Sequence, residues 1–161
     1  MIKTEQKQQK TSEHSGDIVN ALSVDLEDWY HVCGVKKYSA PSQWPAFESR
    51  IRMNTDKVLI LLSDFNVKAT FFILGYIAEK SPSLVKEIAA QGHETASHSY
   101  YHKRLFDMRP KDFDDDLKRS LDCISSLTGK KVCGFRAPEW SIRPSNLWAL
   151  EILKAYNVEY D

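Results

Sequence analysis

Short apolar runs alternate along the chain with longer segments in which apolar residues recur every three or four positions. The short runs are typical of buried strands, and the longer pattern is typical of helices with one apolar face. We expect strands at residues 18–24, 67–74, 93–97, 132–135 and 157–161. We expect helices at residues 48–65, 81–91, 109–129 and 146–156. This alternation of strand and helix predicts an α/β fold with a parallel sheet covered by helices.

Glycine, serine and proline mark several of the expected boundaries. Gly75 follows the second apolar run and should end that strand. Ser81 and Pro82 are the residue types preferred at the N-cap and at the first position of a helix. Gly129 should end the longest amphipathic helix. The apolar face of that helix comprises Phe113, Leu117, Leu121, Ile124 and Leu127.

Three groups of polar residues lie where an expected strand ends. An acidic cluster, Asp25-Leu-Glu-Asp28, follows the first strand. His98 follows the third strand, and Arg136 follows the fourth. In parallel α/β folds, the side chains that carry out chemistry collect at the carboxyl ends of the strands. We therefore expect these three groups to belong to one site.

The two histidines of His98-Ser-Tyr-Tyr-His102 have the spacing of a metal-binding pair. Two neutral imidazoles four residues apart can bind one divalent cation, from one face of a helical turn or from a folded loop. The alternative is a pair of surface or packed histidines that bind nothing. A carboxylate would complete a three-residue site, and the mixed nitrogen and oxygen ligands favour Zn²⁺.

The acidic cluster offers that carboxylate. Asp25 and Glu27 alternate on the expected strand, so that both side chains can point the same way. We expect Glu27 to bind the metal and Asp25 to stay free as a general base. Asp28 replaces Glu27 as the ligand if the chain has already turned there. The alternative function of the cluster is an ordinary capping or solvated acidic turn.

The segment Gly134-Phe-Arg-Ala-Pro-Glu-Trp140 follows the fourth expected strand. Arg136 can pair with a carboxylate and keep it ionised and oriented. Pro138 stiffens the loop, so that a backbone N–H near Trp140 could donate to an oxyanion. The Trp140 ring could also stack on a sugar. The alternative is a surface arginine in a proline-containing turn.

Composition narrows the class of protein. A chain of 161 residues with 42% apolar and 27% charged residues fits one globular domain and argues against a membrane protein. No run approaches the roughly 18 apolar residues of a membrane span. The formal net charge is zero, with 22 basic and 22 acidic residues. That balance argues against nucleic acid as a partner and is compatible with a neutral substrate.

The cysteines and the N-terminus bear on location. Cys33, Cys123 and Cys133 form neither a CxxC zinc pattern nor a disulfide framework. Residues 1–17 are polar and lack the apolar core of a signal peptide, so we expect a disordered tail before a domain at residues 18–161. Both features favour a cytoplasmic location. The sequence gives no indication of the oligomeric state.

Taken in order, the motifs resemble those of the polysaccharide deacetylases, the NodB-homology or carbohydrate esterase family 4 group. The resemblance covers about residues 18–161, and the combination of the histidine motif with the Arg-x-Pro-x-aromatic motif is its most specific part. The first motif is similar to a branch that includes exopolysaccharide-locus deacetylases and allantoinase-like members. The four matching segments are Asp25–Asp28, Ala69–Gly75, Gly92–His102 and Phe135–Trp140.

The resemblance implies a distorted (β/α) barrel and metal-dependent removal of acetyl groups from an N-acetylated oligo- or polysaccharide. It implies that Asp25 is the base and that Arg136 orients it. The metal ligands would be His98, His102 and either Glu27 or Asp28.

The resemblance also implies residues that contact the substrate, and the motifs depart from the usual family pattern at two places. The Trp140 backbone N–H would help hold the oxyanion, and Trp29, Pro138 and Trp140 are the expected substrate contacts. The first motif lacks the adjacent Asp-Asp pair common in the family, and a tryptophan stands where the Arg motif usually has tyrosine.

We expect the chain to hold only the N-terminal part of such a barrel. A (β/α) barrel usually needs about 250 residues, and the family's later Leu-x-His motif, which supplies the general acid, has no counterpart after His102. Two other functions remain open. One is hydrolysis of a small cyclic amide, as in the allantoinase-like relatives, and the other is a non-catalytic glycan-binding module that uses Trp29, Trp44 and Trp140.

Overall fold

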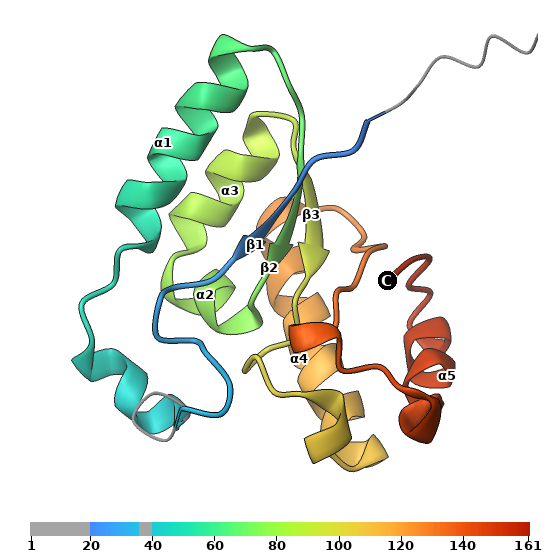
Figure 1. Cartoon of the computed structure of the whole chain (residues 1–161). Coiled ribbons are helices and arrows are strands. Elements are labelled where there is room, and N and C mark those ends of the chain that lie inside the picture. The colour runs from blue at the N-terminus through green and yellow to red at the C-terminus, as the bar shows by residue number, and fades with distance from the viewer. Residues whose placement is uncertain (1–19, 36–39) are drawn as a thin grey trace, which may run out of the picture.

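A three-stranded parallel sheet forms the centre of the molecule (Figure 1). The structure, a computed structural model, describes residues 20–35 and 40–161, so the expected N-terminal tail lies outside the described residues. The strands are β1 (Ser23–Leu26), β2 (Thr70–Ile73) and β3 (Glu94–Ser97), and they lie side by side in chain order. Each is shorter than the segment for which a strand was expected.

The last two expected strands pair at single residues only. Phe135 forms a parallel bridge with Ser97 beside β3, and Tyr160 forms one with Gly134. The parallel α/β class is therefore confirmed, with five parallel segments in chain order. The described residues form an open sheet, with β1 at one edge and Tyr160 at the other.

Five helices connect these segments, and their bounds lie close to the amphipathic patterns. One helix was not predicted: β2 ends at Ile73, and Gly75, which was expected only to end that strand, begins α2. The helices are α1 (Ile51–Asp64), α2 (Gly75–Lys80), α3 (Pro82–Ala90), α4 (Pro110–Thr128) and α5 (Trp148–Ala155). Short 3-10 turns lie at Pro41–Ala46, Leu105–Asp107, Pro138–Trp140 and Pro144–Asn146. In the described part of the chain, none of these helices has both the length and the apolar character of a membrane span.

The helix ends follow the sequence signals with one exception. Gly129 adopts the left-handed conformation with φ of 66°, as expected for a residue that ends a helix. Pro82 is the first residue of α3, but the Ser81 hydroxyl makes no capping hydrogen bond. Because α2 ends immediately before it, Ser81 instead donates its backbone N–H to the Ile77 carbonyl and serves as the C-cap of that helix.

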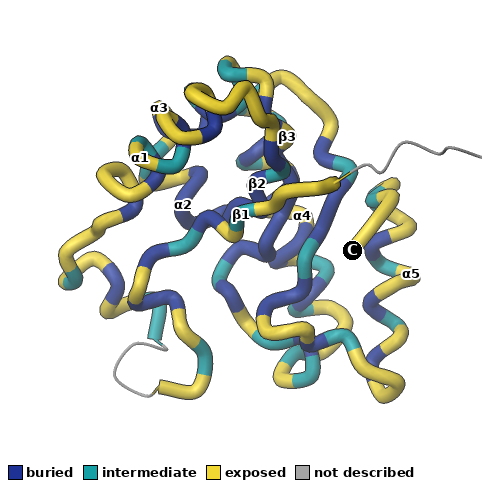
Figure 2. Tube along the Cα trace, turned by 45° about the horizontal axis from the view of Figure 1, so that its top comes forward, coloured by how far each residue is buried: buried dark blue, intermediate teal, exposed yellow. Residues whose placement is uncertain are grey.

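The two faces of the sheet differ in what they carry. Phe71 and Ile73 of β2 are fully buried in the core beneath the helices. Phe72 points to the opposite face, where it pairs in register with Asp25 of β1 and Ala96 of β3. Figure 2 shows β2 and β3 mostly buried at the centre, β1 largely exposed, and the outer sides of the helices exposed. The chemistry of Asp25 therefore belongs to the face that the helices do not cover.

Helix α4 packs against elements from both the earlier and the later part of the described chain. It packs against α2, α3, α5 and β3, and its expected apolar face is buried at Phe113, Leu117 and Ile124. The Phe113 ring meets the Phe135 ring edge-on at 5.6 Å between centroids. This packing fixes the segment after Phe135, which carries Arg136, against β3.

Gly75 connects β2 to the loop that follows β3. Its N–H donates to the Ser99 carbonyl at 2.9 Å, and the next N–H, of Tyr76, donates to the Tyr100 carbonyl at 3.2 Å. This approach leaves no room for a side chain at residue 75. A Cβ there would lie 2.4 Å from Tyr100 Cδ2 and 3.0 Å from Ser120 Cα.

Gly75→Ala should lower the free energy of unfolding by about 2–3 kcal/mol, because the new methyl group overlaps backbone as well as side-chain atoms. Gly129→Ala is the control, since nothing lies within 4 Å of its Cβ position and only its positive φ is strained, at about 1 kcal/mol. Urea unfolding of both variants measures the difference. An equal loss in the two variants would show that the contact at Gly75 is not tight.

Candidate metal centre

The register of the sheet sets the position of the candidate site. Leu26, Ile73 and Ser97 lie opposite one another as the last residues of the three strands. The next residues of the two outer strands are Glu27 and His98, so both emerge at the carboxyl edge of the sheet. The expectation that these strand ends meet in one place is met by the structure.

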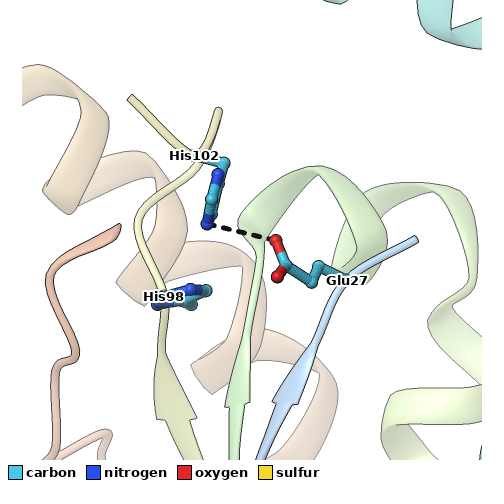
Figure 3. Close-up of side chains that lie close together, drawn as sticks. All are labelled: Glu27, His98 and His102. Carbon is cyan, nitrogen blue, oxygen red and sulfur yellow. Dashed lines mark ion pairs between the residues drawn. The ribbon is translucent and has the colours of Figure 1, made fainter. Parts of the chain in front are cut away.

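Three side chains meet at this edge: Glu27, His98 and His102 (Figure 3). One potential ligand atom of each lies within 4.8 Å of the other two. The Glu27 Oε2 and His102 Nε2 atoms are 3.1 Å apart. Both imidazoles are buried, and the Glu27 side chain is one-third exposed. The described residues hold no other group of this kind.

His98 presents its Nε2 atom to the group because its other nitrogen is occupied. The Arg136 carbonyl oxygen lies 2.8 Å from His98 Nδ1 and can only accept, so Nδ1 carries the proton and donates. Burial lowers the pKa of His98, which keeps the ring neutral. A neutral imidazole held through Nδ1–H is the usual form of a metal-ligating histidine.

His102 comes from a folded loop rather than a helical turn. Ser99 and His102 both have positive φ, at 62° and 53°, and the His102 N–H donates to Ser99 Oγ at 3.0 Å. From α4, the buried Asp116 carboxylate accepts the N–H groups of Tyr100 and Tyr101 at 2.7 and 3.2 Å. Of the two geometries that the histidine spacing permits, the structure therefore has the loop.

The protonation states in the group match a cation site. Burial, with the neighbouring histidines, lowers the pKa of His102 to about 3, so its ring is neutral at ordinary pH. Burial and the negative charges of Asp25 and Glu139 raise the pKa of Glu27 to about 7. Ionisation of Glu27 is therefore disfavoured in the metal-free site, and a bound cation would favour it.

The geometry also fits a metal ion. Glu27 Oε2 is buried and has no hydrogen-bond partner among the described residues, which is costly for a carboxylate oxygen. Ligand atoms ~2.0–2.1 Å from one tetrahedral Zn²⁺ lie roughly 3.3 Å apart, close to the 3.1 Å between Glu27 and His102. The donor set of two imidazole nitrogens and one carboxylate oxygen suits Zn²⁺ and leaves a coordination position open.

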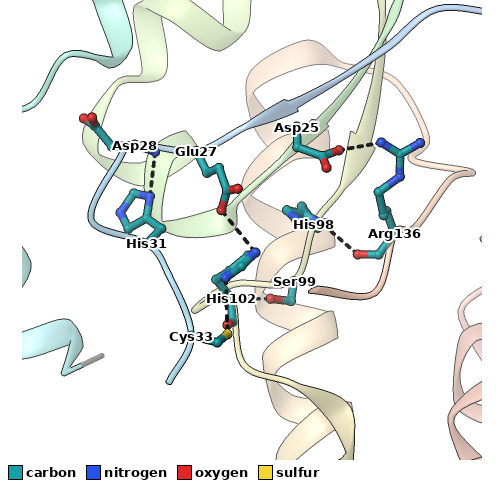
Figure 4. A network of polar contacts seen from close by, with 9 residues as sticks. All are labelled: Asp25, Glu27, Asp28, His31, Cys33, His98, Ser99, His102 and Arg136. Carbon is teal, nitrogen blue, oxygen red and sulfur yellow. Dashed lines mark hydrogen bonds and ion pairs between the residues drawn. The ribbon is translucent and has the colours of Figure 1, made fainter. Parts of the chain in front are cut away.

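Asp25 and Arg136 form an ion pair beside the metal group (Figure 4). Arg136 Nη1 lies 2.6 Å from Asp25 Oδ1, and Nη2 donates to Ser23 Oγ at 2.9 Å. The guanidinium also lies over the Phe72 ring, 3.9 Å from its centroid. The contact that the sequence predicts between Arg136 and a carboxylate is present, and it points Asp25 into the same cavity as Glu27.

Asp28 has a structural role and lies outside the metal group. Its carboxylate accepts hydrogen bonds from Ser49 Oγ at 2.6 Å and from the Arg50 N–H at 2.9 Å, at the start of α1. It also accepts the Trp29 N–H at 3.0 Å. Figure 4 shows this carboxylate turned away from the histidines. The alternative in which Asp28 replaces Glu27 as ligand is therefore not the arrangement in this structure.

The expectations for the Arg136 loop are met in part. Trp140 is 89% exposed and is among the residues that line the cavity, as a residue that stacks on a substrate would have to be. Its backbone N–H, however, donates to the Ala137 carbonyl at 3.2 Å inside a 3-10 turn. The predicted oxyanion donor is thus already engaged in this structure. Pro138 begins the turn and is buried, so it supports the loop without lining the cavity.

Trp29 and Trp44 do not line the cavity. Trp29 packs edge-on against Tyr30 and Phe47, and its indole N–H donates to the Glu48 carbonyl at 3.0 Å. Trp44 is 3% exposed. The substrate contact predicted for Trp29, and glycan stacking through Trp44, therefore have no support in the geometry.

The cavity over the group has a volume of about 430 Å³. Two polar residues that were not predicted from the sequence lie at the site: Glu139, which lines the cavity, and Cys33, whose thiol contacts His102. Burial raises the pKa of Cys33 to about 12, so it is a neutral thiol. Neither residue belongs to a spacing pattern that the sequence could reveal. The cavity is lined by Asp25, Glu27, Val32, His98, His102, Arg136, Ala137, Glu139 and Trp140.

Behind the site, His31 fixes the turn that follows Glu27. Its Nδ1 accepts the Asp28 N–H at 2.8 Å, and its own N–H donates to the Asp28 carbonyl at 3.0 Å. The ring is 1% exposed and packs edge-on against Trp44. Burial lowers the pKa of His31 to about 4, because protonation would charge a buried ring and remove its acceptor nitrogen.

The metal-free chain should lose stability through His31 as the pH falls. The unfolded chain takes up this proton near pH 6.5 and the folded chain only near pH 4, so the loss lies between those values and amounts to at most roughly 3 kcal/mol. His31→Asn keeps an acceptor but cannot titrate. Urea unfolding between pH 7 and pH 4 should show the wild-type advantage over this variant shrinking; a constant advantage would exclude the assignment.

Comparison with known proteins identifies the family and agrees with the fold. A family model described as polysaccharide deacetylase matches residues 37–160. The chain is 31% identical over 137 residues to a peptidoglycan-N-acetylglucosamine deacetylase from Bacillus cereus, a match covering 79% of this chain and 50% of that protein. It is 29% identical over 99 residues to a chitooligosaccharide deacetylase from a Bradyrhizobium species, covering 62% and 43%. The chain thus spans half or less of the length of these two relatives.

Solved structures agree on the architecture. A family 4 carbohydrate esterase from Streptomyces lividans in complex with acetate superposes with a TM-score of 0.65 at 21% identity, over 87% of this chain and 59% of that one. A CE4-family pseudoenzyme from Bacillus anthracis superposes with the same TM-score and identity, over 87% and 41%. Because an esterase and a pseudoenzyme share the fold, activity has to be argued from the residues at the site.

Proposed function

The chain belongs to the polysaccharide deacetylase family, and from that premise we propose that it carries the metal centre and the base of a hydrolase that removes acetyl groups from N-acetylated sugars. The observation that carries the proposal is the meeting of Glu27, His98 and His102 beside the Asp25–Arg136 pair. These residues provide a place for a cation, a proton acceptor and a means of orienting that acceptor within one cavity.

Glu27, His98 and His102 would hold a divalent cation, which we propose to be Zn²⁺. When bound, such an ion polarises a carbonyl and makes a water molecule more acidic. The two histidines are ready for this role because their rings are neutral and each has its Nε2 atom on the side of the group. Three protein ligands leave a position for water and substrate, as in catalytic rather than structural zinc sites.

Asp25 would accept the proton of the attacking water. Arg136 holds Asp25 Oδ1 at 2.6 Å, which leaves Oδ2 free to receive the proton. The Arg136 guanidinium is the ion-pair partner of this carboxylate and fixes the direction in which Oδ2 points. The bond to Ser23 and the Phe72 ring beneath the guanidinium keep Arg136 in place. Arg136 therefore acts on the reaction through the orientation of Asp25.

The substrate would lie between the metal group and Trp140. An acetamido group is small and neutral, and the sugar that carries it offers an apolar face to the exposed indole ring. Protonation of the leaving amine needs a further acid. Among the described histidines, His31 and His93 are buried and do not line the cavity, so we assign this step to neither.

A substrate with a good leaving group tests the proposal without that acid. The chain loaded with Zn²⁺ should release 4-nitrophenolate from 4-nitrophenyl acetate, since this anion leaves unprotonated. Acetate release from N-acetylchitooligosaccharides measures the complete reaction on the same preparation. Removal of the metal should abolish release of 4-nitrophenolate, together with any release of acetate from the oligosaccharide. A chain that binds Zn²⁺ and hydrolyses neither substrate would contradict the proposal and favour a glycan-binding module.

Asp25→Asn should keep the metal and lose about 10²–10⁴-fold in turnover, because the amide cannot take the proton from water. Metal content by elemental analysis and the rate on 4-nitrophenyl acetate give the two readouts. Asp64→Asn, an exposed change at the end of α1, is the matched control and should retain both. Full activity of Asp25→Asn would remove Asp25 from the mechanism.

His98→Ala should weaken Zn²⁺ binding by roughly 100-fold or more, since loss of a ligand should exceed the 10–100-fold effect of an outer partner. Chelator competition measures the affinity directly. A variant with wild-type affinity would refute the ligand assignment.

The alternative function, hydrolysis of a small cyclic amide, is tested with a different substrate. Ring opening of a small cyclic ureide in place of acetate release would favour that alternative.

A further inference from the structure

We propose that Cys33 is a positioning residue that holds the metal ligand His102 by its backbone and its ring at once. The inference rests on the proposed metal centre and goes beyond the three ligands themselves. Cys33 lies in the loop after β1, 69 residues before His102 in the chain. Figure 4 shows its sulfur beneath the His102 ring, on the side away from Glu27.

The first contact fixes the backbone of His102. The Cys33 thiol donates to the His102 carbonyl oxygen at 2.9 Å. On the other side of the same residue, the N–H donates to Ser99 Oγ. His102 has a φ of 53°, in the left-handed region that a side chain with a Cβ seldom adopts. Bonds on both sides of the residue oppose its return to an ordinary conformation.

The second contact fixes the ring. The Cys33 sulfur also lies 3.5 Å from His102 Nδ1. When the thiol donates to the carbonyl, its sulfur lone pairs face the ring and can accept a proton held on Nδ1. The His31 backbone carbonyl is a further acceptor near this ring. Both neighbours favour the Nδ1–H tautomer, which leaves the Nε2 lone pair toward Glu27.

The arrangement gives the two histidine ligands matching support. His98 donates its Nδ1–H to the Arg136 carbonyl, and His102 has its Nδ1 against Cys33. Outer partners of this kind set the tautomer and orientation of metal-binding histidines, and their loss costs about 10–100-fold in metal affinity. Cys33 is not itself a member of the ligand group, which consists of Glu27, His98 and His102.

The test compares metal binding by Cys33→Ala and Cys33→Ser in the full chain. Cys33→Ala should weaken Zn²⁺ and Co²⁺ binding by about 10–100-fold in chelator competition. Cys33→Ser keeps a donor and an acceptor and should recover most of that loss. Cys123→Ala, on α4 away from the site, is the matched control and should bind as the wild type does. The ligand-field spectrum of bound Co²⁺ should change in Cys33→Ala and return in Cys33→Ser.

A second measurement needs no metal. Nitrogen-15 spectra of the histidine rings in the metal-free chain should show His102 as the Nδ1–H tautomer in the wild type and in Cys33→Ser. In Cys33→Ala, the tautomers should mix. Urea unfolding of the metal-free variants checks that each is folded.

The outcomes separate this inference from the proposed function. Wild-type affinity and an unchanged His102 tautomer in Cys33→Ala would overturn the positioning role. A thiolate-to-cobalt charge-transfer band in the wild type would also overturn it, because Cys33 would then be a ligand. Failure of the wild type to bind metal would instead remove the proposed metal centre, and the tautomer spectra would still decide whether Cys33 orients the ring.

Discussion

The parallel register of three short strands is the constraint on which the site depends. Leu26, Ile73 and Ser97 end their strands at one level, so Glu27 and His98 leave the sheet side by side. A slip of one residue would turn Phe71 and Ile73 out of the core and move Asp25 to the helix-covered face. The burial of those two side chains therefore selects the register, and the register places Asp25 and the residues proposed to bind metal.

The site that results is held by contacts from several distant elements. The loop that carries His102 is shaped by Asp116 of α4, by Gly75 at the start of α2 and by Cys33 from the first loop. Each contact excludes other backbone conformations of this loop, in which Ser99 and His102 have strained, positive φ angles. Burial keeps the imidazoles neutral, and burial together with the charges of Asp25 and Glu139 raises the pKa of Glu27 to about 7. The fold thereby brings together lone pairs of two neutral imidazoles and one carboxylate, and the carboxylate oxygen Glu27 Oε2 has no hydrogen-bond donor among the described residues.

Local patterns were sufficient to predict the parallel α/β class and the residues at the strand ends. They could not decide between Glu27 and Asp28, because that choice depends on β1 ending at Leu26 and on Asp28 bonding to Ser49. Helix α2 was missed because a glycine after an apolar run indicates a turn, whereas Gly75 is required by its contacts with Tyr100 and Ser120. Cys33 gave no signal, since its partner lies 69 residues away.

Strand β1 carries both Asp25 and the chain into Glu27, and in the described part of the molecule its only strand partner is β2. Local opening of an edge element costs less than global unfolding. If β1 detached, the proposed base Asp25 and the proposed ligand Glu27 would leave the site together, and the two histidines would remain on β3 and its loop. Bound metal would oppose that opening by cross-linking the edge strand to its second neighbour. Occupancy of the site and closure of the sheet edge are thus thermodynamically linked, each favouring the other.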